Sequence, residues 1–179
     1  MTTIVNRYGQ ALYAIYGNND VIELNTPENC IAVEDAPNPD MYYKDGWVNM
    51  PTKPSSFCTF NYHTKKWEDL RTLDQARADK WESIKTERDA LEYGGFSHNG
   101  NIYDSDLKAQ SRIIAASELG IETDWVLKNN QFITLSGYDL IDLKQSLINH
   151  IAMCHSKGRQ ARKLLYESTT IEQINSITL

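Results

Sequence analysis

The sequence is short of cysteine and of long apolar runs. Its three cysteines, Cys30, Cys58 and Cys154, are an odd number, which favours free thiols in a reducing compartment over a disulfide framework. No run approaches the ~18 apolar residues that a membrane span needs, and residues 1–7 lack the apolar centre and cleavage site of a signal peptide. We therefore expect synthesis in a cytoplasm and no insertion into a membrane.

Positive charge is also scarce. Lysine and arginine number 18 against 24 aspartates and glutamates, which gives a formal net charge of −6. Because proteins bind phosphate backbones and anionic lipids largely through lysine and arginine, we expect neither nucleic acid nor an anionic membrane surface as a partner. Internal repeats and low-complexity tracts are absent too, which disfavours a long fibrous shaft.

Short segments rich in tyrosine, valine and isoleucine alternate with turn-forming residues along the first 70 residues. Six of them have the length and composition of strands: Ala11–Tyr16, Val21–Leu24, Ile31–Glu34, Met41–Tyr43, Trp47–Asn49 and Phe57–Tyr62. We predict a small antiparallel β domain over residues 1–70. Pro51 and Pro54 lack amide donors, so the link before the sixth segment should lie outside the ladder.

From Leu73 onward the apolar pattern becomes helical, and four helices are predicted. Their starts carry capping residues: Thr72 with Gln75, Ser105 or Asp106, Ser136 with Asp139, and Thr170 with Gln173. The first helix should end at Gly94-Gly95 and the second at Gly120. The apolar face of the third helix comprises Leu140, Leu143, Leu147, Ile148, Ile151, Cys154, Ala161 and Leu165. Gly158 leaves open whether that helix is unbroken.

Two hairpins complete the predicted fold. Asn99-Gly100 is a strong hairpin signal and predicts one near residues 96–103, and short apolar segments on either side of residues 128–131 predict another over residues 125–134. The sequence thus predicts an α+β protein. A small N-terminal antiparallel β domain, residues 1–70, precedes a mainly helical domain, residues 71–179, that carries the two hairpins.

Charged residues of the first helix and the following hairpin form one candidate site. Arg88 falls on the apolar side of the first helix, so its guanidinium needs a carboxylate partner or a route to water. Asp104 and Asp106 are the nearest candidates in sequence. A structural ion pair is favoured over a catalytic carboxylate pair, and the spacing lacks the ligands of a calcium loop.

His150 and Cys154 stand four residues apart on the third helix, where both side chains could approach one metal ion. His155 is predicted to face the other flank. A zinc site would need a further ligand from a set without paired spacing: Cys30, Cys58, His63 and His98. A core cysteine beside a helix-flanking histidine is therefore favoured, and no oxyanion motif accompanies the pair as nucleophile and base. We predict no catalytic, cofactor-binding or metal-binding residues.

Two surfaces each allow a structural and a functional interpretation. Lys157, Arg159, Arg162 and Lys163 form a basic helix end, either solvated or a docking patch for an acidic partner. Tyr42, Tyr43 and Trp47 flank Asp45-Gly46, either as an exposed aromatic hairpin that binds a partner or as part of the β core.

A series of motifs runs from the sixth β segment to the C-terminus. It includes Phe60-Asn61-Tyr62, Trp67, Arg71-Thr72-Leu73, Lys80-Trp81, Arg88-Asp89, Gly94-Gly95-Phe96, Asn99-Gly100, Tyr103-Asp104-Ser105-Asp106, Gln110-Ser111-Arg112-Ile113, Asp124-Trp125, Thr134-Leu135-Ser136 and Thr169-Thr170-Ile171-Glu172. Over about Pro54 to Leu179 the chain resembles a domain of unknown function common in tailed-bacteriophage proteins encoded among tail-fibre and tail-fibre-assembly genes. That family offers no catalytic residues to transfer.

The resemblance implies a nonenzymatic phage tail component, associated with the tail fibre or baseplate and acting through protein–protein contacts. It would be made in the host cytoplasm and located in the virion tail, with tail-fibre or baseplate proteins or further copies of itself as partners, and without a cofactor. One alternative is a tail-fibre assembly chaperone absent from the mature virion. Another, a small envelope-polysaccharide hydrolase, is disfavoured because Asp104 and Asp106 are explained as turn and cap residues.

Overall fold

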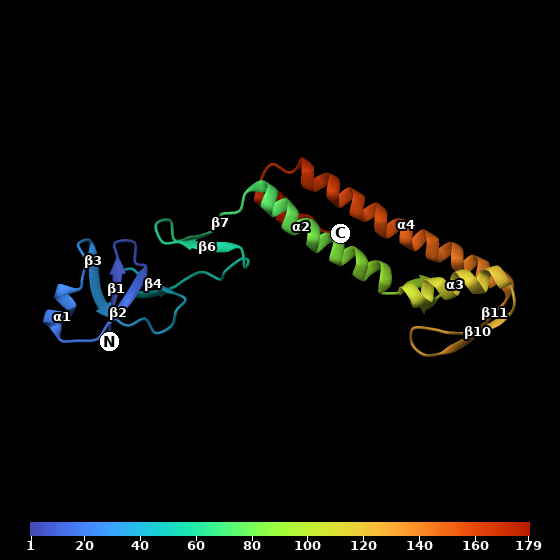
Figure 1. Cartoon of the computed structure of the whole chain (residues 1–179), viewed down its shortest axis with the longest axis horizontal. Helices are drawn as coiled ribbons and strands as arrows, with labels where there is room; N and C mark the ends of the chain where they lie inside the picture. Colours follow the sequence, from blue (N-terminus) through green and yellow to red (C-terminus); the bar gives the residue numbers. More distant parts are fainter. The chain divides into compact units, whose positions relative to one another are not determined.

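The computed structural model describes all residues from 1 to 179 and contains five helices and eleven strands (Figure 1). The predicted α+β class is confirmed: an N-terminal β region precedes a helical region that carries two hairpins. The chain divides into two compact units, Met1–Arg71 and Thr72–Leu179, called the β unit and the helical unit below. No helix combines the length and the apolar character needed to cross a bilayer.

The β unit is built from one three-stranded sheet and two hairpins. Its elements are β1 (Thr2–Asn6), β2 (Ala11–Ile15), α1 (Asn19–Leu24), β3 (Cys30–Glu34), β4 (Met41–Tyr43), β5 (Trp47–Asn49), β6 (Cys58–Asn61) and β7 (Lys66–Asp69). The sheet is antiparallel in the order β2-β1-β3, and the hairpins are β4–β5 and β6–β7. The predicted set of strands omitted β1, which is the central strand and buries Thr3, Ile4 and Val5.

The prediction of a strand at Val21–Leu24 is wrong, because these residues belong to α1. The Asn18 side chain accepts a hydrogen bond from the Val21 amide at 3.1 Å and caps the helix. Asn18 satisfies an amide that would otherwise lack a partner, and this local bond outweighs the β propensity of Val21 and Ile22.

An aromatic cluster around Phe60 forms much of the core of the β unit. The Phe60 ring lies 5.7 Å from Tyr42, 5.1 Å from Tyr62 and 5.2 Å from Trp67, measured between centroids. The only other buried apolar side chains in this unit are Ile4 and Val5. The β unit therefore depends on ring contacts and backbone pairing more than on a large aliphatic core.

The helical unit contains α2 (Leu73–Tyr93), β8 (Phe96–His98), β9 (Asn101–Tyr103), α3 (Leu107–Leu119), β10 (Thr123–Val126), β11 (Phe132–Leu135), α4 (Gly137–Glu167) and α5 (Ile171–Ser176). Figure 1 shows α2 and α4 side by side and antiparallel. Capping boxes at Thr72, Ser136 and Thr170 begin three helices as predicted. Asp106, not Ser105, caps α3, and Gly120 ends it in the left-handed conformation.

One unbroken helix, α4, contributes to both cores of the helical unit. Near its start, Leu140, Leu143 and Leu147 pack with side chains of α3, β8, β9 and the β10–β11 hairpin. Near its end, Ala161 and Leu165 pack with α2, α5 and the C-terminus. Ile148, which was predicted for the buried face, is exposed.

Gly158 does not interrupt α4. It is buried, and a Cβ atom there would lie 3.3 Å from Cδ of Arg88 on α2. The glycine thus lets the two helices approach closely at this level. Tertiary packing on either side of Gly158 offsets the low helix propensity of glycine.

Gly9 offers a test of packing in the β unit. Its φ is +76°, and a Cβ atom there would overlap the carbonyl oxygen of Tyr43. We expect Gly9→Ala to destabilise the unit by more than the ~1–3 kcal/mol typical of a non-glycine residue in strained backbone, because the overlap adds to that strain. Amide hydrogen exchange of β1 measures the loss.

The matched control is Gly46→Ala in the same unit. Gly46 has a φ of +147°, but no atom lies within 4 Å of an added Cβ. This variant should carry the backbone strain without the overlap and so lose less protection. Equal losses in the two variants would contradict the packing described here.

Candidate functional site

The predicted pairing of Arg88 with Asp104 or Asp106 is wrong. Arg88 Nη2 instead lies 2.7 Å from Oδ1 of its neighbour Asp89. Asp106 accepts hydrogen bonds from the amides of Ala109 and Lys108, and the bond from Ala109 contributes most to lowering the pKa of its carboxyl group. The carboxylate of Asp106 is thus used to cap α3.

His150 serves the C-terminus of α2. Its Nε2 atom lies 3.2 Å from the carbonyl oxygens of Leu91 and Glu92, and because carbonyl oxygens only accept hydrogen bonds, this nitrogen must donate. The Ser105 hydroxyl also donates to Glu92 O, at 2.5 Å, and Lys128 Nζ donates to Gly94 O. Side chains from three other segments therefore satisfy the last carbonyls of α2, which a helix leaves unpaired.

The hydrogen bonds of His150 argue against both a zinc site and a nucleophile–base pair formed with Cys154. The nitrogen that lies nearest Cys154, 3.8 Å from Sγ, is the one that carries the donated proton. His155 Nε2 lies 3.3 Å from Oε2 of the buried Glu92, so its partner is on α2. No group of three histidine, cysteine, aspartate or glutamate side chains is arranged to hold a metal ion.

The remaining predicted zinc ligands are elsewhere. His98 Nδ1 is 2.8 Å from the Ser146 hydroxyl, and Cys30, Cys58 and His63 belong to the β unit. Burial raises the pKa of the Cys154 thiol, and the negative charge of Glu92 raises it further. A raised pKa lowers the thiolate fraction, which is the reactive form of cysteine.

The aromatic β4–β5 hairpin is packed into the β unit. Tyr42 stacks on Phe60, Tyr43 contacts Trp47 edge-on at 5.5 Å, and the Trp47 indole donates to the carbonyl oxygen of Glu34 at 2.8 Å. This geometry favours the core interpretation of these three aromatic residues over an exposed binding hairpin.

The basic end of α4 is partly engaged within the helical unit. The Arg162 guanidinium lies 5.3 Å from the Trp81 ring centroid, and Lys163 Nζ lies 3.7 Å from Oε1 of Glu167. Lys157 and Arg159 are exposed. Two of the four cations are thus available to solvent without a close aromatic or acidic partner.

The most exposed part of the β unit is the segment Ala11–Leu24, which comprises β2, a turn and α1. All its residues are exposed except Ile15 and Ile22. Its exposed apolar side chains are Leu12, Tyr13, Tyr16, Val21 and Leu24. In the pairing with β1, Ile4 faces Tyr13 and Val5 faces Ala11, so Leu12 is the extra residue of a bulge and has no cross-strand neighbour.

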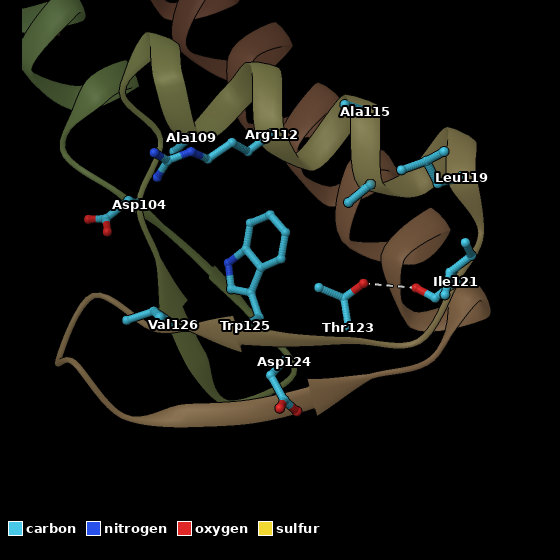
Figure 2. A pocket seen from close by; sticks show the side chains of 11 residues that line it. Asp104, Ala109, Arg112, Ala115, Leu119, Ile121, Thr123, Asp124, Trp125 and Val126 are labelled. Carbon is cyan, nitrogen blue, oxygen red and sulfur yellow. Dashed lines mark hydrogen bonds between the residues drawn. The ribbon is translucent and has the colours of Figure 1, made fainter.

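A cavity of about 650 Å³ lies in the helical unit between α3 and β10 (Figure 2). The Trp125 indole stands in its centre, Arg112 crosses above it, and Leu119 and Ile121 lie at one end. In the sequence, Arg112 and Trp125 stand out only as parts of the motifs Gln110-Ser111-Arg112-Ile113 and Asp124-Trp125. Their convergence depends on the packing of a helix against a hairpin, which no local pattern reports.

Residues 75–178 match a known family, the domain of unknown function DUF4376. The chain belongs to this family. The DUF4376 match covers nearly the whole helical unit, including α4 and the cavity, and leaves the β unit outside. No curated protein and no solved structure matches the chain.

Cysteine alkylation tests the buried end of the α2–α4 contact. We expect iodoacetamide to modify the half-buried Cys30 and Cys58 well before Cys154, because Cys154 is fully buried and has a raised pKa. Timed alkylation followed by peptide mass spectrometry gives the three rates. Alkylation in urea, where all three are exposed, is the control, and a native Cys154 rate as high as that of Cys58 would refute the arrangement.

Proposed function

We propose that this DUF4376 protein is a nonenzymatic component of a bacteriophage tail that acts through protein–protein contacts. In this proposal the β unit is the adaptor that contacts a tail-fibre or baseplate protein, and the helical unit is a rigid packing platform. The phage context is supported by the resemblance of the sequence to phage tail-fibre-associated proteins, and the family match itself covers residues 75–178. The mode of action is supported by the exposure of Ala11–Leu24.

That exposure is the observation that carries the proposal. In a unit with three buried apolar side chains, five large apolar side chains of one segment are left in contact with water. Burying one such side chain contributes ~1.5–3 kcal/mol, so a partner covering several of them would gain appreciable free energy. Exposed apolar side chains are typical of interaction surfaces where they form a patch, and these five follow one another in a single segment of the chain.

Strand pairing offers the same segment a second source of affinity. β2 lies at the edge of the sheet and is hydrogen-bonded to β1 on one side only. An extended segment of a partner can pair with such an edge through its backbone, while neighbouring side chains supply specificity.

The use of candidate reactive groups in the fold supports the nonenzymatic part of the proposal. Asp106 caps α3, His150 caps the C-terminus of α2, and Arg88 pairs with the adjacent Asp89. Each group has a structural partner that accounts for its position.

Quantitative mass spectrometry of purified virions, alongside a lysate of infected cells, tests the location. We expect the chain in virions at a fixed ratio to the tail proteins, since an adaptor stays in the assembled particle. Abundance in the lysate together with absence from virions would contradict this proposal and favour an assembly chaperone.

A pair of variants tests the role of the exposed segment. Tyr16 is 77% exposed in the β unit and Tyr138 is 87% exposed in the helical unit, so neither Tyr16→Asp nor Tyr138→Asp should change stability by more than ~0.5 kcal/mol. We expect Tyr16→Asp to lower the amount of the chain in virions several-fold and Tyr138→Asp to leave it unchanged. The reverse pattern would place the contact on the helical unit.

A further inference from the structure

Two hydrogen-bond donors in the cavity between α3 and β10 have no partner within the chain. The indole nitrogens of Trp47 and Trp67 donate to the carbonyl oxygens of Glu34 and Pro51, whereas those of Trp81 and Trp125 donate to none within the chain. Arg112 forms no ion pair or hydrogen bond, and its charge acts only at longer range on Asp106. The N–H group of a buried tryptophan usually has an acceptor, so a ligand that covers Trp125 would have to bring one.

The two donors lie toward the same end of the cavity. Figure 2 shows the indole nitrogen and the Arg112 guanidinium on the side nearer Asp104. Guanidinium groups bind carboxylates through paired hydrogen bonds, and an indole N–H adds a third donor. The carboxylate of Asp104 at this end has no partner either, and it favours a positive group beside the bound carboxylate.

The opposite end of the cavity is apolar. Leu119 is 73% exposed and Ile121 is 64% exposed, and Ala115 and Ala116 leave room along α3. Thr123 turns its hydroxyl to the carbonyl oxygen of Ile121 at 2.9 Å, so that polar group is already satisfied (Figure 2). An aromatic or branched aliphatic side chain placed between Trp125 and these residues would cover surface now exposed to water.

The length of the cavity along α3 suits a short peptide. The lining residues of α3 extend from Ala109 to Leu119, a rise of ~15 Å, which equals four or five residues of extended chain. The volume of about 650 Å³ exceeds what one side chain fills.

We propose that this cavity binds a peptide segment of a partner protein in which an aromatic or branched aliphatic residue stands beside an aspartate or glutamate. The apolar side chain packs between Trp125 and Leu119, and the carboxylate accepts hydrogen bonds from Arg112 and the Trp125 indole. A lysine or arginine next to the acidic residue pairs with Asp104. The proposal rests on the helical unit alone and does not depend on the phage context.

A defined library tests this specificity. Acetylated, amidated pentapeptides with three randomised central positions are captured on the immobilised full-length chain and identified by mass spectrometry. We expect enrichment of aromatic, leucine or isoleucine residues adjacent to aspartate or glutamate. The affinity of an enriched peptide is then measured for the wild type and for variants.

The variants remove one donor at a time and keep the fold. Arg112 is exposed, so Arg112→Gln should fold normally and weaken the peptide about ten-fold, the effect of losing a charge-assisted hydrogen bond. Trp125→Phe keeps an apolar ring without the N–H and should weaken binding less. Arg159→Gln on α4, outside the cavity, is the matched control and should leave affinity unchanged.

Three results would overturn the proposal: no enrichment over a blank support, enriched peptides that bind Arg112→Gln as tightly as the wild type, or an equal loss in Arg159→Gln. A small-molecule site would be shown by 3-phenylpropionate shifting the NMR signals of Trp125 and Arg112 while no pentapeptide does, and this too would overturn docking of a peptide. None of these results bears on the virion measurement.

Discussion

The continuity of α4 is the constraint on which the helical unit depends. A single helical face carries Leu140, Leu143 and Leu147 into one core and Ala161 and Leu165 into the other. A break between these sets would let each core form in a different orientation. Between the two cores, Gly158 leaves room for Arg88 of α2, whose Cδ would lie only 3.3 Å from a Cβ atom added at the glycine.

The continuity of α4 also explains the polar contacts at the C-terminus of α2, which lies between the two cores. Because α2 ends against the middle of α4, the carbonyl oxygens of Leu91 and Glu92 are partly buried and need donors. His150, Ser105 and Lys128 provide them from three separate segments. The buried carboxyl group of Glu92 lies 3.3 Å from Nε2 of His155 in the same region, which gives it a polar partner. His150 and Cys154, four residues apart on α4, thus lie where the end of α2 packs against this helix.

The two units differ in how they could engage partners. The β unit has little apolar core and exposes a contiguous segment, so its interactions would be driven by covering that segment. The helical unit is well packed and offers a preformed cavity with two free donors, which favours selective recognition of a particular side-chain pattern. In the proposed adaptor, the exposed segment of the β unit would bind one partner by covering apolar surface. The cavity of the helical unit would bind a second partner by recognising a particular side-chain pattern.

Features that depend on residues close together in the sequence, such as helix starts, could be predicted from the sequence. Thr72, Ser136 and Thr170 bind amides three residues on, so their spacing alone located three helix starts. Val21 and Leu24 were misassigned because the cap at Asn18 outweighed their strand propensity, and Arg88 was misassigned because its partner is the adjacent Asp89. The central position of β1 and the cavity around Trp125 depend on contacts between distant segments, which no window of sequence contains.

Photo-crosslinking in infected cells tests whether the exposed segment of the β unit contacts a tail protein. A benzoylphenylalanine residue in place of Tyr16 would lie on the exposed segment of the β unit, and one in place of Tyr138 would lie on the helical unit at similar exposure. We expect the probe at position 16 to capture a tail-fibre or baseplate protein and the probe at position 138 to capture none. Capture only from position 138, or no tail protein captured from position 16, would contradict it.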